Sequence, residues 1–408
     1  MTADWPKAPL LLVASSSRTG PAESQILTAR YLRSQGIDAR FAADTTQPGD
    51  IGEHLAHAGV PWLTALRLSR KVKLRDVVHD AGQLSLWVQQ GRPDLLHAAF
   101  AHDHHLCLWA ACRAGPAREN LRIVRTAHRR EDVAPGRLRH RTRALLATDG
   151  VVVHCAAYRD LLLQQGLQSD RVLAIPGAVD AARFTPGRAE HLRTQWGIPQ
   201  SARLAGIVSR MKPERGHRVL LEGFAKSLLA VKDGWLVLVG RGEDEEPLKR
   251  FAAALPNEAG RRIVFGGYLR GEGLVDAYRA LDVAVWLREG NDGACRGVLE
   301  AMACATPVIA GREGAPGELV RNGLDGATVD PSSPDELAAA LSALLSDPSR
   351  SRALGESARK RAEDHSPERF AAALLGFYRS LRAMPPVGLR GRPLSLPAVT
   401  PASTPTSP

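Results

Sequence analysis

The chain alternates short apolar runs with longer amphipathic segments, and this alternation limits the folds that it can adopt. The apolar runs of the first half are PLLLVASSS, DARFAAD, DLLHAAF, LRIVRTAH, GVVVH and RVLAIPG. Helix-like segments such as ESQILTARYLRSQG, HHLCLWAACRAG and AAYRDLLLQQG lie between some of them. Because strand–helix alternation is typical of parallel sheets covered by helices, the sequence predicts an α/β fold.

The same pattern restarts in the second half, with the strand-like runs ARLAGIVSR, WLVLVG, RRIVFGG, DVAVWL and TPVIAG. The segment 178–200 is rich in turn residues and predicts the junction, and a length of 408 residues also favours two domains. We therefore expect one domain over 1–180 and another over 190–365, with ligands at the carboxyl ends of the strands. The tail 385–408 is rich in Pro, Ser and Thr and is expected to be disordered.

The composition narrows the class of partner. A formal charge of +11 favours an anionic partner: nucleic acid, a phosphorylated substrate or an acidic membrane face. Aromatic residues make up only 5% of the chain, without an aromatic-rich basic motif, so we expect no nucleic acid. The odd, scattered set of five cysteines argues against a disulfide framework. No run of 18 apolar residues occurs, and the run at 10–14 is short for a signal peptide, so we expect a cytoplasmic protein.

The segment 292–310, DGACRGVLEAMACATPVIA, places acids and glycines directly before a helix-like run. A helix N-terminus presents unpaired N–H groups, and Gly293 and Gly297 would let a ligand approach the backbone. This pattern suits a diphosphate, with Arg296 as a charged contact. Glu300 is placed to accept hydrogen bonds from ribose hydroxyls, and Asp292 to face what lies beyond the phosphates. An N-capping Asp292 and a solvated Glu300 remain the alternative.

Two further segments carry candidate ligand-binding residues. GIVSRMKPERGHRVLLEGFA places Arg210, Lys212 and Arg215 between a strand and a helix, where cations suit a phosphate cluster. A basic surface loop is the alternative. LVLVGRGEDEEPL runs from a strand into Gly240 and Gly242, which is weak evidence for a nucleotide-binding turn.

In their order, and with VLAIPGAVDAARFTP before them, these segments resemble the retaining GT-B glycosyltransferases of family 4. DGACRGVLEAMACATPVIA is similar to the family's two glutamates separated by seven residues, which lead into E-A-M-A-x-G-x-P-V-[IV]-A. SRMKPERG is similar to its R-L-x-x-x-K-G element, and VLAIPGAVDAARFTP to its I-P-N-G-V-D-x-x-x-F-x-P hinge. The resemblance is dense over 150–380 and weaker over 1–150. It implies two Rossmann-like domains facing a central cleft, with a C-terminal helix over 366–384 that crosses back to the N-terminal domain.

The resemblance also implies roles for residues of the second, donor-binding domain. Glu300 would hold the donor ribose, and Asp292 stands where the family has a glutamate that contacts the donor sugar. Arg210 matches the arginine that binds the diphosphate, whereas Arg215 stands where the family has a lysine. Both departures change geometry, since Asp292 is one methylene shorter and a guanidinium is a planar fork. The donor-binding residues implied are Gly20, Arg210, Arg215, Gly240, Gly293, Arg296, Gly297 and Glu300.

In the first, acceptor-binding domain, the loop 17–20 is similar to a flexible glycine-containing loop that faces the donor phosphates, and it contains Gly20. His128 sits where the family has a histidine near the transferred sugar. Asp103 and His104, in another strand-end loop, are further candidates. The catalytic set implied by the resemblance is His128, Asp292, Arg210 and Arg215.

The implied activity is transfer of a sugar, with retention at the anomeric carbon, from a UDP- or GDP-linked nucleotide-sugar to a glycan or lipid-linked acceptor. The setting would be cell-envelope polysaccharide or lipopolysaccharide synthesis. Because side chains and the helix terminus would neutralise the leaving diphosphate, and no Asp-x-Asp motif occurs, we expect neither a metal nor a separate cofactor. A nucleotide-sugar epimerase or a phosphorylase of the same fold and a non-catalytic nucleotide-sugar-binding protein remain alternatives.

Two basic clusters lie in the expected acceptor domain. The segment 67–75 holds five cations, four of which would share one face if the segment were helical, and 122–143 holds eight arginines against two acids. They suggest an acceptor that is phosphorylated or lipid-linked, at an anionic membrane surface on the inner face of the plasma membrane. An arginine-rich surface without a partner is the alternative.

Overall fold

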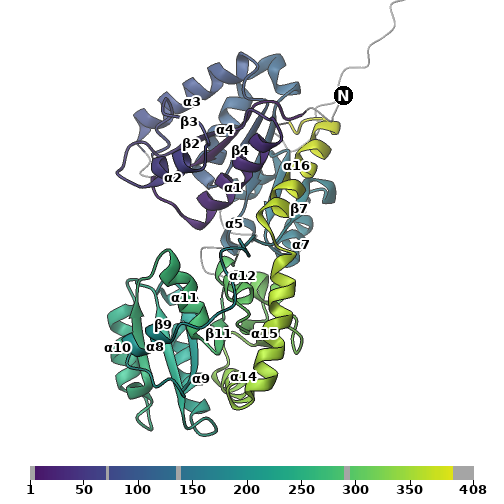
Figure 1. The fold of residues 1–408 in the computed structure, drawn as a ribbon. Helices are drawn as coiled ribbons and strands as arrows, with labels where there is room; N and C mark the ends of the chain where they lie inside the picture. The colour runs from purple at the N-terminus through teal and green to yellow at the C-terminus, as the bar shows by residue number, and fades with distance from the viewer. Residues whose placement is uncertain (1–4, 70–72, 135–138, 289–294, 389–408) are drawn as a thin grey trace, which may run out of the picture.

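The computed structural model describes residues 5–69, 73–134, 139–288 and 295–388, which form two lobes, each built on a parallel sheet (Figure 1). The first lobe has the strand order β3-β2-β1-β4-β5-β6-β7. Its strands are β1 Pro9–Val13, β2 Arg40–Ala43, β3 Trp62–Leu63, β4 Leu95–Ala98, β5 Arg122–Thr126, β6 Gly150–Val153 and β7 Val172–Ala174. Its helices are α1 Gly20–Ser34, α2 Ile51–His57, α3 Leu74–Gln89, α4 Ala101–Cys112, α5 Arg130–Val133, α6 Arg139–Leu146 and α7 Ala156–Gln164.

The second lobe has the strand order β10-β9-β8-β11-β12-β13. Its strands are β8 Arg203–Val208, β9 Gly234–Val239, β10 Ile263–Gly267, β11 Val283–Trp286, β12 Val308–Gly311 and β13 Gly326–Val329. Its helices are α8 Glu190–Gln195, α9 His217–Ser227, α10 Glu245–Ala253, α11 Glu272–Ala280, α12 Arg296–Ala303, α13 Gly314–Leu319, α14 Pro334–Ser346 and α15 Pro348–Glu363. Short 3-10 turns lie at Gly115–Glu119, Ser169–Arg171, Pro213–Arg215 and Ala259–Arg262.

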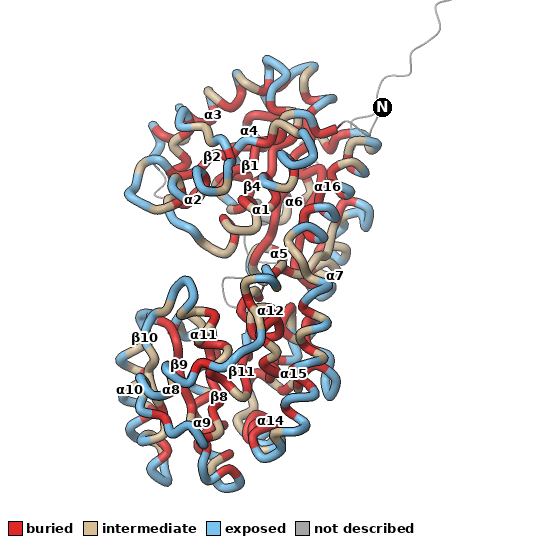
Figure 2. Tube along the Cα trace, viewed as in Figure 1, coloured by how far each residue is buried: buried red, intermediate tan, exposed pale blue. Residues whose placement is uncertain are grey.

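The strands form the centre of each lobe because their side chains are apolar on both faces. All residues of β1, β5, β6, β11 and β12 are buried, and Figure 2 shows the buried strands between more exposed helices. Continuous apolar runs are typical of parallel strands covered on both sides, so the α/β prediction is confirmed. The sequence patterns missed the short strand β3 and the edge strand β13.

The last helix, α16 Pro367–Ala383, leaves the second lobe and packs against the first (Figure 1). Phe370, Leu374 and Tyr378 of α16 belong to the same buried cluster as Val13 and Ile26 of the first lobe. Burial of this apolar stripe gives the helix its position, because each side chain of this size removed from water contributes about 1.5–3 kcal/mol. The chain therefore crosses between the lobes twice.

Arginines of the first lobe hold the C-terminal end of α16. Arg122 donates to the carbonyls of Leu381, Arg382 and Met384 at 2.9, 3.3 and 2.7 Å. These are carbonyls that a helix end leaves without a partner, so a cation there is favourable. Arg122 is 2% exposed and Arg125 is 3% exposed. The prediction that the cluster at 122–143 is a surface cluster is therefore wrong for these two residues.

The segment directly after α16 is also anchored. Arg171 donates to the carbonyl of Pro385 at 2.8 Å, and the N–H of Val387 donates to Asp149 at 2.7 Å. Asp149 is fully buried and also accepts from Arg118 at 2.9 Å. The expected disordered tail therefore cannot begin at 385; residues 389–408 lie outside the described residues.

The two lobes touch at the ends of α7 and α13. Glu318 of α13 accepts from the N–H groups of Ala156 and Ala157, the first two residues of α7, at 2.8 and 3.1 Å. A carboxylate of the second lobe thus serves as the N-cap of a helix in the first, where it also meets the positive end of the helix dipole.

Candidate functional site

The first lobe has its topological switch point between β1 and β4, where the order of strands reverses. The loop after β1 contains the segment 17–20, for which flexibility was expected. The N–H of Arg18 donates to Asp50 at 2.8 Å, and its guanidinium to Glu23 at 2.5 Å. Thr19 caps α1 by accepting from the N–H of Ala22 at 3.3 Å, and Gly20 is the first residue of that helix. The loop is therefore hydrogen-bonded to α1 and to the residue before α2, and its flexibility stays a prediction.

Asp103 and His104 lie in the first turn of α4, not in a loop, and both are buried. Asp103 accepts from the N–H of Ala14 and of Phe100, each at 3.1 Å, and burial raises its pKa to about 7. His104 bonds to the hydroxyl of Thr148 at 2.7 Å. The contacts of Asp103 join the loops after β1 and β4, whereas His104 contacts the segment between α6 and β6, so both candidates have structural partners.

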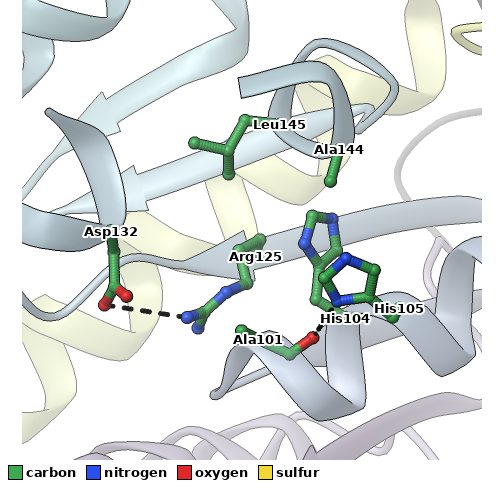
Figure 3. A pocket seen from close by; sticks show the side chains of 7 residues that line it. All are labelled: Ala101, His104, His105, Arg125, Asp132, Ala144 and Leu145. Atoms are coloured by element: carbon green, nitrogen blue, oxygen red, sulfur yellow. Dashed lines mark hydrogen bonds and ion pairs between the residues drawn. The ribbon is translucent and has the colours of Figure 1, made fainter. Parts of the chain in front are cut away.

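A small pocket lies beside these residues, on the α4 side of the sheet (Figure 3). The ring of His104 and the guanidinium of Arg125 line it, and Asp132 lies 3.8 Å from Arg125. Arg125 also donates to the carbonyls of Ala99 and Thr126. The arginine is thus held among strand-end carbonyls, and the pocket offers space for about one water molecule.

His128 follows β5 and is buried, at 3% exposure. Its Nδ1 lies 3.2 Å from Nε2 of His154, and its ring centroid is 6.3 Å from that of Phe100. Burial, together with the nearby His154 and Arg125, holds the pKa of His128 well below its usual value. The imidazole is therefore neutral at neutral pH. Its Nε2 is buried and has no hydrogen-bond partner within the described ranges.

The second lobe has its switch point between β8 and β11. β8 leads on to β9 and β10 on one side, whereas β11 leads to β12 and β13 on the other. Ligands of open α/β sheets bind at the carboxyl ends of strands at such a point. The predicted cations follow β8, and the predicted helix terminus follows β11, so the fold brings together two segments that are about 80 residues apart in the sequence.

The cations of the segment after β8 differ in their exposure to solvent. Arg210 is exposed, whereas Arg215 is buried with its guanidinium 5.7 Å from the ring centroid of Trp286. Trp286 is the last residue of β11, so this contact joins the two strand ends. Lys212, considered as a substitute for the family lysine, lies 3.7 Å from Glu243. Arg215 therefore links the ends of β8 and β11, whereas Lys212 lies beside an acid of the segment after β9.

Sequence reasoning missed His217, the first residue of α9. Its Nε2 lies 3.3 Å from the hydroxyl of Ser209, and burial lowers its pKa to about 4. It follows directly after the cation-rich SRMKPERG segment, which ends at Gly216 and was the only signal available. His217 holds the loop after β8 against the start of α9.

Glu300 lies one turn inside α12 and is half-buried. The hydroxyl of Tyr278, from α11, donates to its Oε2 at 2.8 Å. Burial and the charge of Glu300 raise the pKa of Tyr278 well above its usual value, so the phenol stays a donor. The carboxylate therefore has a fixed orientation before any ligand arrives, which the alternative of a solvated glutamate does not require.

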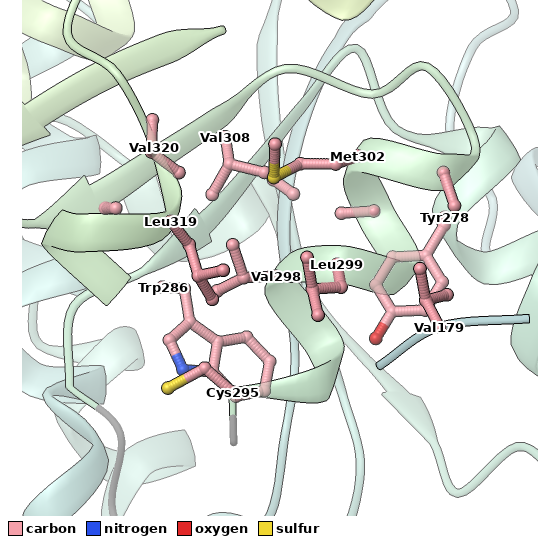
Figure 4. Close-up of a cluster of buried hydrophobic side chains, with 14 of the residues drawn as sticks. Val179, Tyr278, Trp286, Cys295, Val298, Leu299, Met302, Val308, Leu319 and Val320 are labelled. Carbon is pink, nitrogen blue, oxygen red and sulfur yellow. The ribbon is translucent and has the colours of Figure 1, made fainter. Parts of the chain in front are cut away.

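Two of the three described glycines of the predicted donor site, Gly297 and Gly240, have a packing role. A Cβ on Gly297 would lie 2.2 Å from the ring of Trp286, which packs in the cluster of Figure 4. A Cβ on Gly240 would lie 1.9 Å from the carbonyl oxygen of Ser209. Both positions therefore require glycine for a close approach within the protein, and the expected approach of a ligand there stays a prediction.

Arg296 begins α12 and acts across the space between the lobes. Burial alone would raise the pKa of Glu23, in the first turn of α1, but the hydrogen bond and charge of Arg18 and the charge of Arg296 hold it below its usual value. The N-terminal ends of α1 and α12 therefore lie close enough for charges to interact. Both helices have eight or more residues, and their N-termini, together with Arg296, favour the binding of an anion.

Asp292 and Gly293, predicted to contact the donor, lie outside the described residues. Within the described ranges, no group of three or more His, Cys, Asp or Glu side chains is placed to hold a metal ion. No helix in the same ranges is both long and apolar enough to cross a bilayer.

Comparison with known proteins agrees with this geometry. Residues 22–183 match the model of Glycosyltransferase Family 4, and residues 189–361 match that of Glycosyl transferases group 1. The D-inositol 3-phosphate glycosyltransferase of Corynebacterium urealyticum is 35% identical over 226 residues, 53% of this chain and 53% of that protein. A GDP-mannose-dependent monoacylated alpha-(1-6)-phosphatidylinositol monomannoside mannosyltransferase of Corynebacterium glutamicum is 30% identical over 198 residues, 46% of this chain and 51% of that protein. The chain thus spans about half the length of the curated relatives it matches.

Among solved structures, HepE of Anabaena in complex with UDP and glucose has a TM-score of 0.74 at 20% identity, over 91% of this chain and 99% of that chain. This likeness shows a shared fold. The two family matches coincide with the two lobes, and the predicted donor-site motifs that are described lie at the switch point of the second. The chain belongs to the family 4 glycosyltransferases and has the GT-B fold.

Proposed function

We propose that this protein transfers a sugar from a nucleotide-sugar donor, with retention at the anomeric carbon, to a glycan or lipid-linked acceptor. The observation that carries the proposal is the convergence at the second switch point. Arg215 lies over Trp286, and Glu300 is oriented by Tyr278 at the front of α12. A fixed cation, a helix N-terminus and an oriented carboxylate suit a diphosphate and the ribose attached to it.

In the proposed mechanism, Arg210, Arg215 and the N-terminus of α12 stabilise the charge that develops on the departing nucleoside diphosphate. Such preorganised charge stabilisation is usually the largest single contribution to catalysis. Glu300 accepts hydrogen bonds from the ribose hydroxyls. The neutral imidazole of His128, on the opposite lobe, lies at a strand end from which it can contact the transferred sugar, and Asp292 is the proposed second sugar contact.

The donor and acceptor classes have support from the relatives. The names of two of them specify GDP-mannose and phosphorylated inositol acceptors, and HepE was solved with UDP. We therefore propose a UDP- or GDP-linked donor that acts as co-substrate without a metal. The acceptor is proposed to carry a phosphate or a lipid, which places the protein at the inner face of a cell membrane in envelope glycan synthesis.

The donor half of this proposal is tested by thermal unfolding with a panel of nucleotide-sugars. A ligand that binds the folded chain at about 100 times its Kd stabilises it by about 2.7 kcal/mol, so the correct donor raises Tm. Glu300→Ala is expected to abolish the shift, whereas Glu258→Ala, at a carboxylate on the surface of the same lobe, is expected to keep it. If no nucleotide-sugar raises Tm of the unaltered chain, the proposed donor site is wrong.

The transfer step needs its own measurement, because an epimerase or a binding protein would also bind the donor. The expected result is a glycosylated acceptor whose anomeric configuration, determined by NMR, equals that of the donor. Conversion of the donor without any acceptor would instead identify an epimerase.

A further inference from the structure

Helix α3 of the first lobe presents large apolar side chains to solvent. Leu74 is 79% exposed, Val78 59% and Leu86 49%, and Trp109 of the neighbouring α4 is 47% exposed. The α3 residues are four and eight residues apart, so they follow one side of the helix. These four are the majority of the seven exposed large apolar side chains in the described residues, and they gather on one lobe.

Three of these residues, Val78, Leu86 and Trp109, border a groove between α3 and α4. Its volume is about 440 Å³, and Val78, Gly82, Leu86, Trp109 and Arg113 are among the residues that line it. The guanidinium of Arg113 lies 5.9 Å from the ring centroid of Trp109. We call the surface formed by Leu74, Val78, Leu86, Trp109 and Arg113 the α3–α4 face.

The charge of the α3–α4 face has one sign. Both carboxylates of α3 turn inward. Asp76 pairs with Arg67 at 2.6 Å, and Asp80 accepts from the N–H of Leu68 at 2.8 Å. Asp103, the one acid of α4, is fully buried. The exposed Lys and Arg side chains of α3 and α4 and of the residues flanking them are Lys73, Arg75, which also lies 3.5 Å from Asp76, and Arg113.

This arrangement also corrects the predicted basic helix. α3 begins at Leu74, so Arg67 and Lys73 precede it, and residues 70–72 lie outside the described ranges. The cations form the border of an apolar stripe, and do not share one face of a helix. A stripe of this kind is the arrangement found at membrane interfaces, where Trp and Leu enter the headgroup region and cations remain beside the phosphates.

We propose that the α3–α4 face binds the surface of an anionic phospholipid bilayer. A second copy of the chain is a poorer partner, because a two-fold interface on this face would bring Lys73, Arg75 and Arg113 close to cations of their own kind. An anionic surface attracts the same cations, and each of them adds to the free energy of binding near such a surface. The inference rests on the proposed function only for the reason why the protein binds a membrane, since the proposed lipid-linked acceptor lies at that surface.

The test is flotation of the full chain with vesicles, either of phosphatidylglycerol mixed with phosphatidylcholine or of phosphatidylcholine alone. The chain is expected to float with the mixed vesicles only. Leu74→Ser and Trp109→Ala are each expected to weaken partitioning about tenfold. Lys73→Gln and Arg113→Gln are each expected to weaken it about fivefold. The matched control is Leu229→Ser, since Leu229 is 78% exposed in the second lobe and is expected to have no effect.

Two outcomes overturn the inference. One is that the chain does not float with the mixed vesicles, or that Leu74→Ser floats as well as the unaltered chain. The other is that the chain is dimeric without lipid and Leu74→Ser makes it monomeric, which assigns the face to a second copy. The nucleotide-sugar Tm shift of the Leu74→Ser variant separates the two proposals, because loss of flotation with an intact shift concerns the α3–α4 face alone.

Discussion

In the first lobe, Arg122 directs its guanidinium at five backbone carbonyls, whereas in the second lobe Arg215 lies over the ring of Trp286 at a switch point. Both side chains are buried, at 2% and 7% exposure. Arg122 donates to the carbonyls at the end of α16. It is the first residue of β5 and lies at the end of that strand opposite to the carboxyl end, where ligands bind. Arg215 follows the carboxyl end of β8, beside α12.

The difference shows that burial of a cation does not by itself identify a ligand site. A buried guanidinium is stable where carbonyls use its N–H groups, and several arginines of the first lobe have this role. A cation at the carboxyl edge of a switch point, next to a helix N-terminus, is placed where the fold leaves room for a ligand. The position of the residue in the topology therefore distinguishes the two cases.

The largest expected effect separates the two arginines directly. Arg215→Gln is expected to lower kcat/KM by about 10²–10³, the typical loss of one group that stabilises developing charge, with little change in unfolding. Arg122→Gln is expected to lower the free energy of unfolding by roughly 3–5 kcal/mol, because it leaves buried carbonyls without donors, and to leave kcat/KM of the folded enzyme unchanged. Steady-state kinetics and urea unfolding measure both. The comparison fails if Arg122→Gln impairs turnover while Arg215→Gln only destabilises.

A smaller effect concerns the packing of the second switch point. Gly297→Ala is expected to destabilise by roughly 1–3 kcal/mol, because the new Cβ would overlap the ring of Trp286. Gly376→Ala, in α16 on the first lobe, is the matched control, since nothing lies within 4 Å of its Cβ position. It is expected to stabilise by about 0.4–1 kcal/mol. Thermal unfolding of both variants checks the prediction, and equal stability of Gly297→Ala and the unaltered chain would contradict the close approach.

The last effect, which is small near neutral pH, is the pH dependence from a buried histidine of the first lobe. Burial, with the charge of Arg125, lowers the pKa of His97 to about 3, and the ring bonds to Tyr378 of α16 at 2.6 Å. Because the folded pKa lies below the unfolded value of about 6.5, the folded chain binds fewer protons, and stability falls as the pH falls from about 6.5 toward 3. The slope is at most about 1.4 kcal/mol per pH unit for this group.

Urea unfolding across this pH range measures the slope, and His97→Gln is the control because it removes the titrating group. The expected result is a smaller loss of stability on acidification in His97→Gln than in the unaltered chain. Equal slopes would show that His97 already titrates normally in the folded chain.

The order of strands and helices was readable from the sequence because continuous apolar runs and amphipathic segments have different periods. The runs predicted as strands became β1, β2 and β4 to β12, but β3 and β13 are too short or too polar to form a pattern. Among the candidate residues, Arg210, Arg215 and Glu300 lie at the predicted edge. The close packing at Gly297 and Gly240 could not be predicted, because a glycine that admits a ligand and one that admits a Trp ring or a carbonyl have the same local sequence.

The sequence by itself determined the α/β class, the division into two halves and the motifs that resemble the family, because these depend on periodicity and local spacing. Only the tertiary structure decided which cations face a site. Arg122 and Arg215 stand in similar strand-adjacent, arginine-rich segments, but their partners come from residues 259 and 71 positions away. The same holds for Glu300, whose orientation depends on a tyrosine of another helix. A side chain's surroundings are set by long-range packing, and local sequence carries no record of it.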